Sequence, residues 1–136
     1  MKKLFVALMA VLMFASCGGD GDKKTNPGQV IDKIISNTET LLQKAERAVR
    51  ADNPEIFVSA FERYADQMVD IYNKYGDTMS NMSREEQNKY RGKAYEMMEL
   101  MEEVEDFLEN EVNQLEPTPS QEKRVLRAAE KLEILD

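Results

Sequence analysis

The feature that most constrains this chain is an apolar pattern with helical spacing, which runs from Pro27 to the C-terminal end. Apolar residues recur three or four positions apart, so in each segment they form a stripe along one side of a helix. All four prolines fall at the edges of these segments, where proline starts or stops a helix. The pattern predicts four helices, over about residues 27–51, 54–75, 84–116 and 119–136, and it predicts no strand.

Polar residues between the stripes support these boundaries. Asn26 is expected to cap the first helix, and Gly76 to end the second. The third and fourth helices each begin with a capping-box pattern, formed by Ser83 with Glu86 and by Thr118 with Gln121. Short connections make helices fold back on one another. We therefore expect an all-α domain over residues 27–136, an antiparallel up-down bundle of four helices in which the third is the longest and the fourth is short.

Five residues carry expectations of their own. Val49 in the first helix and Leu126 in the fourth lie on the stripes and should face the core. Met79 and Met82 lie outside the stripes, in the polar connection before the third helix, where they indicate a partner contact or an ordinary loop. Gly92 is the position at which the third helix would bend, because glycine weakens a helix.

The N-terminal residues form a separate unit. Lys2 and Lys3 precede an unbroken apolar run of eleven residues at positions 4–14. The run is too short for a standard membrane-spanning helix, which needs about 20 apolar residues. It has the length of the apolar part of a secretory signal peptide, and small residues follow it. Residues 1–16 are therefore predicted to be a signal peptide.

The sequence Phe14-Ala15-Ser16-Cys17 resembles the lipobox of bacterial lipoproteins. The resemblance covers the export segment alone, and Phe14 departs from the Leu, Val or Ile more often found at its position. It implies that the thiol of Cys17 receives a diacylglycerol, that cleavage leaves Cys17 as the new N-terminus, and that its amine is then acylated. Cys17 is also the only cysteine in the chain, which suits export into an oxidising compartment.

The residues after the cysteine indicate a tether and a destination. Residues 17–26 are polar and rich in glycine, so we expect a flexible linker between the lipid and the helical domain. Gly18 follows Cys17 at the position where an aspartate often retains a lipoprotein in the inner membrane. The resemblance therefore implies an outer-membrane lipoprotein of a Gram-negative cell envelope, facing either the periplasm or the cell surface.

Composition excludes several classes of protein. The chain contains no histidine, which removes Ser-His and Cys-His nucleophiles and histidine-ligated zinc. Its formal net charge of −8 disfavours nucleic acid as a partner, because such binding depends on cations that neutralise phosphates. No phosphate-binding loop or paired-cysteine metal motif occurs. We expect no enzymatic activity, no cofactor and no metal centre.

Acidic residues crowd the third predicted helix. Glu99, Glu102, Asp106 and Glu109 lie opposite its apolar stripe and form an acidic outer face. Such a face most simply keeps a helix solvated. It is also the surface on which a divalent cation or a protein partner with a basic surface would bind.

A second resemblance concerns a modification. Asp77-Thr78-Met79 resembles the Asp-Thr-apolar sequon of an O-glycosylation system found in some Gram-negative bacteria. The resemblance predicts that Thr78 carries an O-linked glycan.

Together these features predict a small, acidic, lipid-anchored helical protein of the cell envelope that acts as a non-catalytic binding or structural module. The membrane is its first partner, through Cys17. The alternative is a carrier for a ligand or a divalent cation, which would use the Met and Tyr side chains of the interior or the acidic third helix.

Overall fold

The computed structural model describes residues 26–133 and Leu135, and this part of the chain is helical and contains no strand. The all-α class is confirmed, but the predicted number of four helices is wrong, because five α-helices are present there. The elements are α2 (Pro27–Ala51), α3 (Pro54–Ser80), α4 (Arg84–Lys89), α5 (Arg91–Asp106), the π-helical segment η1 (Phe107–Glu111), the 3-10 segment η2 (Val112–Leu115) and α6 (Pro119–Glu133). The predicted signal peptide, Cys17 and the tether up to position 25 lie outside the described residues.

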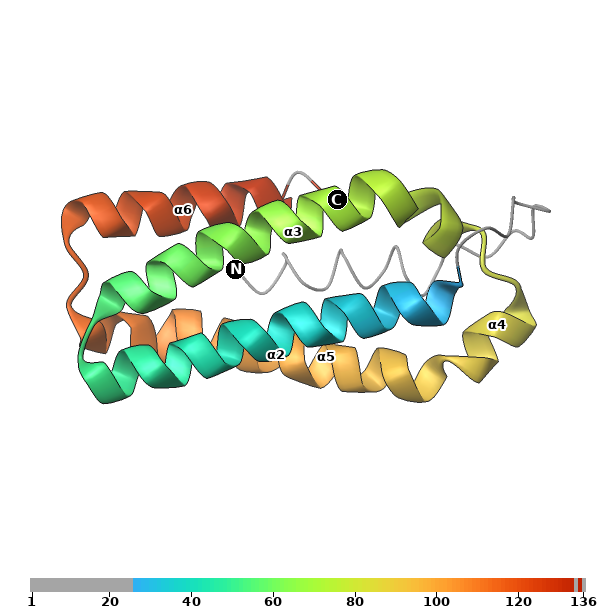
Figure 1. Cartoon of the computed structure of the whole chain (residues 1–136), viewed down its shortest axis with the longest axis horizontal. Helices are drawn as coiled ribbons and strands as arrows, with labels where there is room; N and C mark the ends of the chain where they lie inside the picture. Colours follow the sequence, from blue (N-terminus) through green and yellow to red (C-terminus); the bar gives the residue numbers. More distant parts are fainter. Residues whose placement is uncertain (1–25, 134, 136) are drawn as a thin grey trace.

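The long helices lie side by side along one axis (Figure 1). A two-residue turn at Asp52 and Asn53 sends α3 back along α2. The other face of α2 packs on α5, and α3 packs on α6, so the α2–α3 hairpin is the centre of the bundle. None of the described helices combines the length and the apolarity that a membrane crossing requires.

The predicted helix starts are confirmed by side-chain hydrogen bonds. The Asn26 side chain accepts a bond of 2.8 Å from the backbone N–H of Gly28, and Pro27 occupies the first turn. Both capping boxes form, with the hydroxyls of Ser83 and Thr118 accepting at 3.2 Å from the backbone N–H groups of Glu86 and Gln121. These motifs act over three or four residues, so local sequence is enough to specify them.

The end of the second predicted helix is wrong. α3 does not stop at Gly76 but continues to Ser80, with Asn81 as its cap. Met79 and Met82, predicted to lie outside the core, are both buried in it. Burial of two methionine side chains outweighs the cost of about 1 kcal/mol that a glycine imposes inside a helix.

The third predicted helix is divided at Tyr90, not bent at Gly92. Tyr90 lies between α4 and α5 with φ −99° and ψ 7°, outside regular helical geometry. Its ring lies against Gly28 near the start of α2, and its hydroxyl donates a 2.7 Å hydrogen bond to the side-chain oxygen of Asn26. A contact with a distant helix therefore divides this segment, and Gly92 has open space around it.

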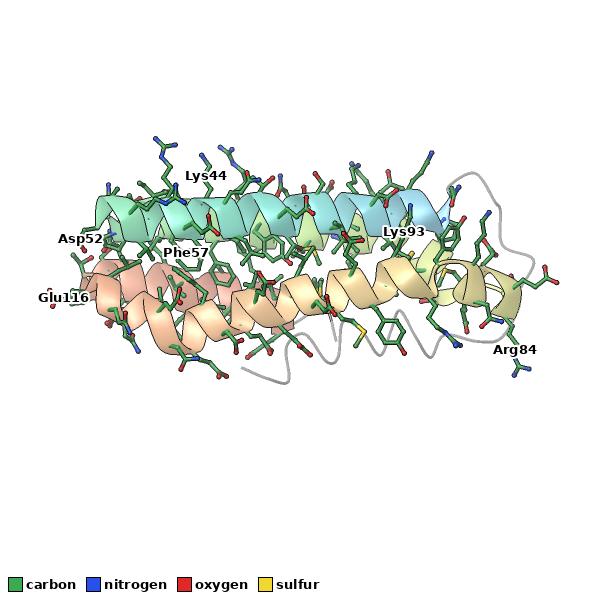
Figure 2. The ribbon with its side chains drawn as sticks, turned by 90° about the horizontal axis from the view of Figure 1, so that it is seen from below. Lys44, Asp52, Phe57, Arg84, Lys93 and Glu116 are labelled. Carbon is green, nitrogen blue, oxygen red and sulfur yellow. The ribbon has the colours of Figure 1, made fainter. Side chains whose placement is uncertain are left out.

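Beyond α5 the chain leaves α-helical geometry twice. The π-helical η1 is followed by the tighter η2, and the segment ends at Glu116, which has φ 52°. The third predicted helix is therefore not the longest, since α3 has 27 residues and α5 has 16. Asp52, with φ 49°, ends α2 at the same end of the bundle (Figure 2).

A column of aromatic rings fills the centre of the core. The rings of Phe57 and Phe61 stack with centroids 5.6 Å apart, and Tyr64 continues the column 6.5 Å further along α3. The ring of Phe107 in η1 packs on the ring of Phe57 with centroids 4.6 Å apart, which joins η1 to the α2–α3 hairpin. All four side chains are buried.

Two residues expected in the core are on the surface. Val49 is 49% exposed and Leu126 is 53% exposed. Both lie at the margin of their stripes, where a small rotation of the helix decides between core and solvent. The apolar spacing was correct for these helices, but it does not fix that rotation.

We predict that Gly28→Ala lowers the free energy of unfolding by about 1–3 kcal/mol, because its Cβ would lie 2.5 Å from Cε1 of Tyr90 and displace the ring. Gly92→Ala is the matched control, since Gly92 is also the second residue of its helix. Its Cβ would meet nothing within 4 Å, so the helix should gain up to about 1 kcal/mol. Urea denaturation of both variants measures this, and equal effects would contradict the Tyr90 contact.

Candidate functional site

A groove of about 450 Å³ lies between α2 and the α5–η1 segment; we call it the acidic groove. Leu42, Ala45 and Val49 of α2 and Phe107 of η1 give it apolar surface. The charged residues that line it are Glu46, Arg50, Glu103, Asp106 and Glu111. Four carboxylates and one guanidinium therefore surround an apolar strip.

The carboxylates of this groove are weakly neutralised. Arg50 contacts Glu46 at 3.8 Å, and both side chains are mostly exposed, so this pair contributes little. Glu103, Asp106 and Glu111 form no ion pair with any residue in the described part of the chain. The groove therefore keeps a negative potential next to the half-exposed side chain of Val49.

The structure separates the four acidic residues singled out from the sequence. Glu99, Glu102, Asp106 and Glu109 are all exposed. Only Asp106 lines the acidic groove, together with Glu103 and Glu111. Sequence reasoning missed Glu103 and Glu111 because it favours the acidic residues directly opposite the apolar stripe. These two residues line the groove because α2 lies beside α5, which the sequence does not show.

Glu105 of α5 differs from these exposed residues in its burial. It is half-buried, and burial, helped by the negative charge of Glu109, raises the pKa of its carboxyl. It does not line the acidic groove. Within the described residues no three acidic side chains converge in a way that would hold a metal ion.

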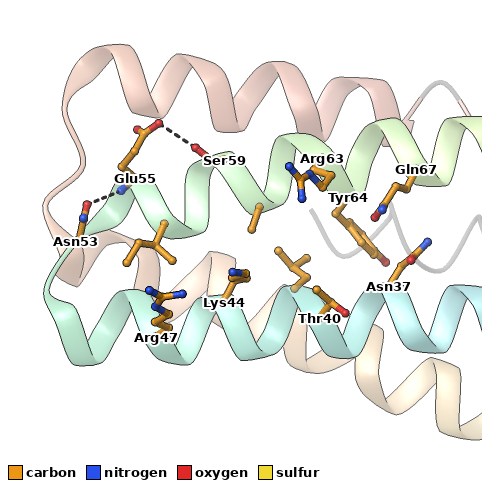
Figure 3. Close-up of a pocket in the computed structure, with 13 residues that line it drawn as sticks. Asn37, Thr40, Lys44, Arg47, Asn53, Glu55, Ser59, Arg63, Tyr64 and Gln67 are labelled. Carbon is orange, nitrogen blue, oxygen red and sulfur yellow. Dashed lines mark hydrogen bonds between the residues drawn. The ribbon is translucent and has the colours of Figure 1, made fainter.

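A second groove, of about 460 Å³, lies between α2 and α3 (Figure 3); we call it the basic groove. Lys44 and Arg47 of α2 and Arg63 of α3 supply its positive charge, and Glu55 is its one carboxylate. Its remaining lining residues are Asn37, Thr40, Leu41, Asn53, Ile56, Ser59, Ala60, Tyr64 and Gln67. This concentration of cations in an acidic protein was missed from the sequence.

A sequence signal for this groove existed. Asn37, Thr40, Lys44 and Arg47 are spaced by three or four residues, so they form a polar strip along α2. This strip forms a groove only together with α3, which places Arg63 beside it. Residues on two helices meet in a way that depends on the helix rotations, which one sequence does not specify.

Glu55 is occupied by contacts away from the cations of the basic groove. Its carboxylate accepts hydrogen bonds from Ser59 at 2.9 Å, from Gln121 at 3.0 Å and from Arg124 at 2.9 Å. The bonds from Gln121, Arg124 and Ser59 hold the pKa of the Glu55 carboxyl below its usual range. Arg124 also pairs with Glu62, so this cluster fastens α6 to α3.

Beneath the basic groove lies a buried hydrogen-bonded pair. The Thr38 hydroxyl donates to the backbone oxygen of Ile34 at 2.7 Å, so its oxygen accepts from the Tyr64 hydroxyl at 3.1 Å. Burial raises the pKa of Tyr64 to about 12. The pair satisfies two polar groups in the core and keeps the groove floor fixed.

The remaining predicted sites are placed as follows. Thr78 is partly buried within α3, in a helix and not in the expected connection. The interior methionines that the carrier alternative would use include Met68, Met97 and Met101, and these three pack in the core. Cys17 lies outside the described residues.

We predict that stability falls above pH 10 through Tyr64. Its folded pKa of about 12 exceeds the ordinary value of 10, so the neutral phenol stabilises the fold below pH 10, and this contribution is lost as pH rises towards 12. Tyr64→Phe should remove on the order of 2 kcal/mol of this pH dependence. Urea titrations between pH 8 and pH 12 measure it, with the exposed Tyr72→Phe as control. Identical pH profiles for wild type and Tyr64→Phe would contradict the assignment.

Comparison with known proteins places no further constraint on these two grooves. No protein-family model, curated protein or solved structure matches the chain.

Proposed function

We propose that the chain is a lipid-anchored, non-catalytic binding module of the Gram-negative cell envelope, and that it holds a basic, amphipathic segment of a protein partner in the acidic groove. The observation that carries this proposal is the combination of Val49, half exposed beside Phe107, with the carboxylates of Glu103, Asp106 and Glu111. A partner helix with one apolar and one cationic face matches both features.

The two kinds of surface would act differently in binding. Burial of Val49 and its apolar neighbours supplies free energy in proportion to the area removed from water. The carboxylates attract a basic segment during approach and disfavour acidic competitors. Such a groove gains specificity from charge and affinity from apolar contact.

The scaffold in this proposal is an antiparallel bundle of four layers, namely α2, α3, the segment from α4 to η2, and α6. The contacts that support it are those of α2 with α3 and α5, and of α3 with α6. Each wall of the acidic groove would belong to a helix that is packed on the core from its other side. Binding of a partner would then cost little free energy for ordering the site.

The anchor in this proposal is the acylated Cys17. One acyl chain holds a protein only marginally at a membrane, whereas two or more hold it stably. The ten residues from Cys17 to Asn26 would give the domain a reach of about 15–20 Å from the lipid. The domain could then meet partners near the membrane without lying on it.

A carrier of small ligands is the alternative function, and the basic groove favours it over a carrier of cations. Its volume of about 460 Å³ lies in the range of small-molecule sites. The acidic outer face of Glu99, Glu102 and Glu109 supports the cation version less well, because these side chains are exposed and do not converge.

Lipidation is tested by metabolic labelling with palmitate. Wild type should incorporate label and sediment with membranes, whereas Cys17→Ala should do neither, because no other residue of the chain offers a thiol. Equal labelling of the two proteins would exclude the anchor.

The acidic groove is tested by charge reversal with a matched control. The double variant Glu103→Lys/Asp106→Lys should weaken the binding of a synthetic amphipathic helix, with leucines on one face and lysines on the other, by at least about tenfold, or 1.4 kcal/mol. Glu99→Lys/Glu102→Lys makes the same charge change on the exposed side of α5 and should weaken binding by less than about threefold. Fluorescence anisotropy measures both affinities.

The apolar part of the groove needs its own variant. Val49→Ser removes apolar area without a change in charge, and it should weaken binding at high and low salt alike. Equal weakening by both charge reversals, with no effect of Val49→Ser, would mean that the peptide responds to overall acidity and that the groove is not the site.

A further inference from the structure

The basic groove brings together three cations that no carboxylate of the described residues holds. By contrast, Lys93, Arg124 and Lys131 are held by carboxylates, with N–O distances of 2.9, 2.9 and 2.8 Å. Lys44, Arg47 and Arg63 form no ion pair with another described residue. Three uncompensated cations therefore line one concavity of a protein whose net charge is −8.

The one carboxylate of this groove does not compensate them. Both carboxylate oxygens of Glu55 accept hydrogen bonds from Arg124 of α6. One of them also accepts a hydrogen bond from the side-chain amide of Gln121, which lies in the same helix. The Glu55 carboxylate is thus held by a different cation, Arg124 of α6, and three cations of the groove remain against this one carboxylate. The groove between α2 and α3 keeps a positive potential.

The polar groups among the cations have unused hydrogen-bonding capacity. Thr40 donates its hydroxyl proton to the backbone oxygen of Ser36 at 2.9 Å, which leaves its oxygen as an acceptor. The side-chain oxygen of Asn53 accepts from the backbone N–H of Glu55 at 3.1 Å, which leaves its amide NH2 as a donor. Such groups recognise hydroxyl and carbonyl groups of a bound molecule.

The walls of the groove are rigid. α2 and α3 are joined by a turn of two residues, and the buried hydrogen bond of 3.1 Å between Thr38 and Tyr64 connects them further along. Ile56 and Ala60 supply apolar surface among the polar groups that line the groove, and Leu41 beside them is buried. The geometry is that of a pre-formed site, which costs little to order on binding.

We infer that the basic groove binds a small organic anion, whose carboxylate or phosphate lies among Lys44, Arg47 and Arg63 and whose body contacts Ile56 and Ala60. The two arginines offer planar, forked donors that suit both kinds of anion, and Lys44 adds a compact charge. This site is separate from the acidic groove, so it stands or falls independently of a protein partner.

The ligand is a free solute or the headgroup of an anionic lipid, since both carry the same chemistry. The full chain, purified from membranes in a nonionic detergent, is titrated by calorimetry with citrate and with glucose 6-phosphate. In a second arm the micelles contain lysophosphatidylglycerol, with zwitterionic lysophosphatidylcholine as its control. Binding in the first arm identifies a solute site, and binding in the second alone identifies a headgroup site.

The variant Lys44→Gln/Arg47→Gln should weaken binding in the responsive arm by at least about tenfold. The control Lys33→Gln/Arg50→Gln removes the same charge from the same helix outside the groove, and it should change affinity by less than about twofold. Arg63→Gln tests the α3 wall and should weaken binding as well.

Two results would overturn the proposal. One is the absence of binding by wild type in both arms at ligand concentrations up to about 10 mM, beyond the range of a useful site. The other is an equal loss of affinity in the groove variant and in the Lys33/Arg50 control, which would show that anions respond to general surface charge. Urea denaturation of every variant is the folding control. Midpoints equal to that of wild type show that a loss of affinity is not a loss of folding.

Discussion

The bundle depends on the aromatic column that α3 places between its neighbours. Phe57, Phe61 and Tyr64 lie at positions that share one face of α3, and their burial fixes how far α2 can approach. Phe107 extends the same contact to η1. The four buried rings thus form a continuous packed unit of α3 and η1, and the two grooves lie along α2 beside it. Large rings keep the backbones apart at the column, and smaller side chains such as Ala45 and Ala60 leave space beside it.

One helix therefore contributes to two surfaces of opposite charge. α2 presents Lys44 and Arg47 to α3, and it presents Glu46 and Val49 to α5. Its charged residues are nearly balanced in number, so the sign of each groove depends on which side of the helix a residue occupies. The net charge of −8 does not show this division. The distribution is more informative, because a ligand meets a local potential within about one Debye length, roughly 8 Å at physiological salt.

The predictable and unpredictable parts of this structure differ in range. Caps at Asn26, Ser83 and Thr118 were predicted because each depends on residues two or three positions away. The division of the third helix at Tyr90 was not predicted, because its cause is Gly28 in another helix. The candidate surfaces follow the same rule. Asp106 was identified as acidic and exposed, whereas its groove needed Phe107 and Val49, and the basic groove needed Arg63 from a second helix.

The irregular segment after α5 connects the core to the proposed partner site. A π-helical turn holds more residues than an α-helical turn, and a 3-10 turn holds fewer, so η1 and η2 have opposite effects on the direction of the side chains. The two effects compensate, and Leu108, Val112 and Leu115 remain buried on both sides of the change. Phe107, the first residue of η1, packs on Phe57 and also lines the acidic groove together with Glu111. π-helical turns inside α-helices are rare and are frequently found at functional sites, whereas a 3-10 turn is common at the end of a helix. Because η1 contributes Phe107 and Glu111 to the acidic groove, its position is a physical argument for the proposed partner site that does not depend on charge.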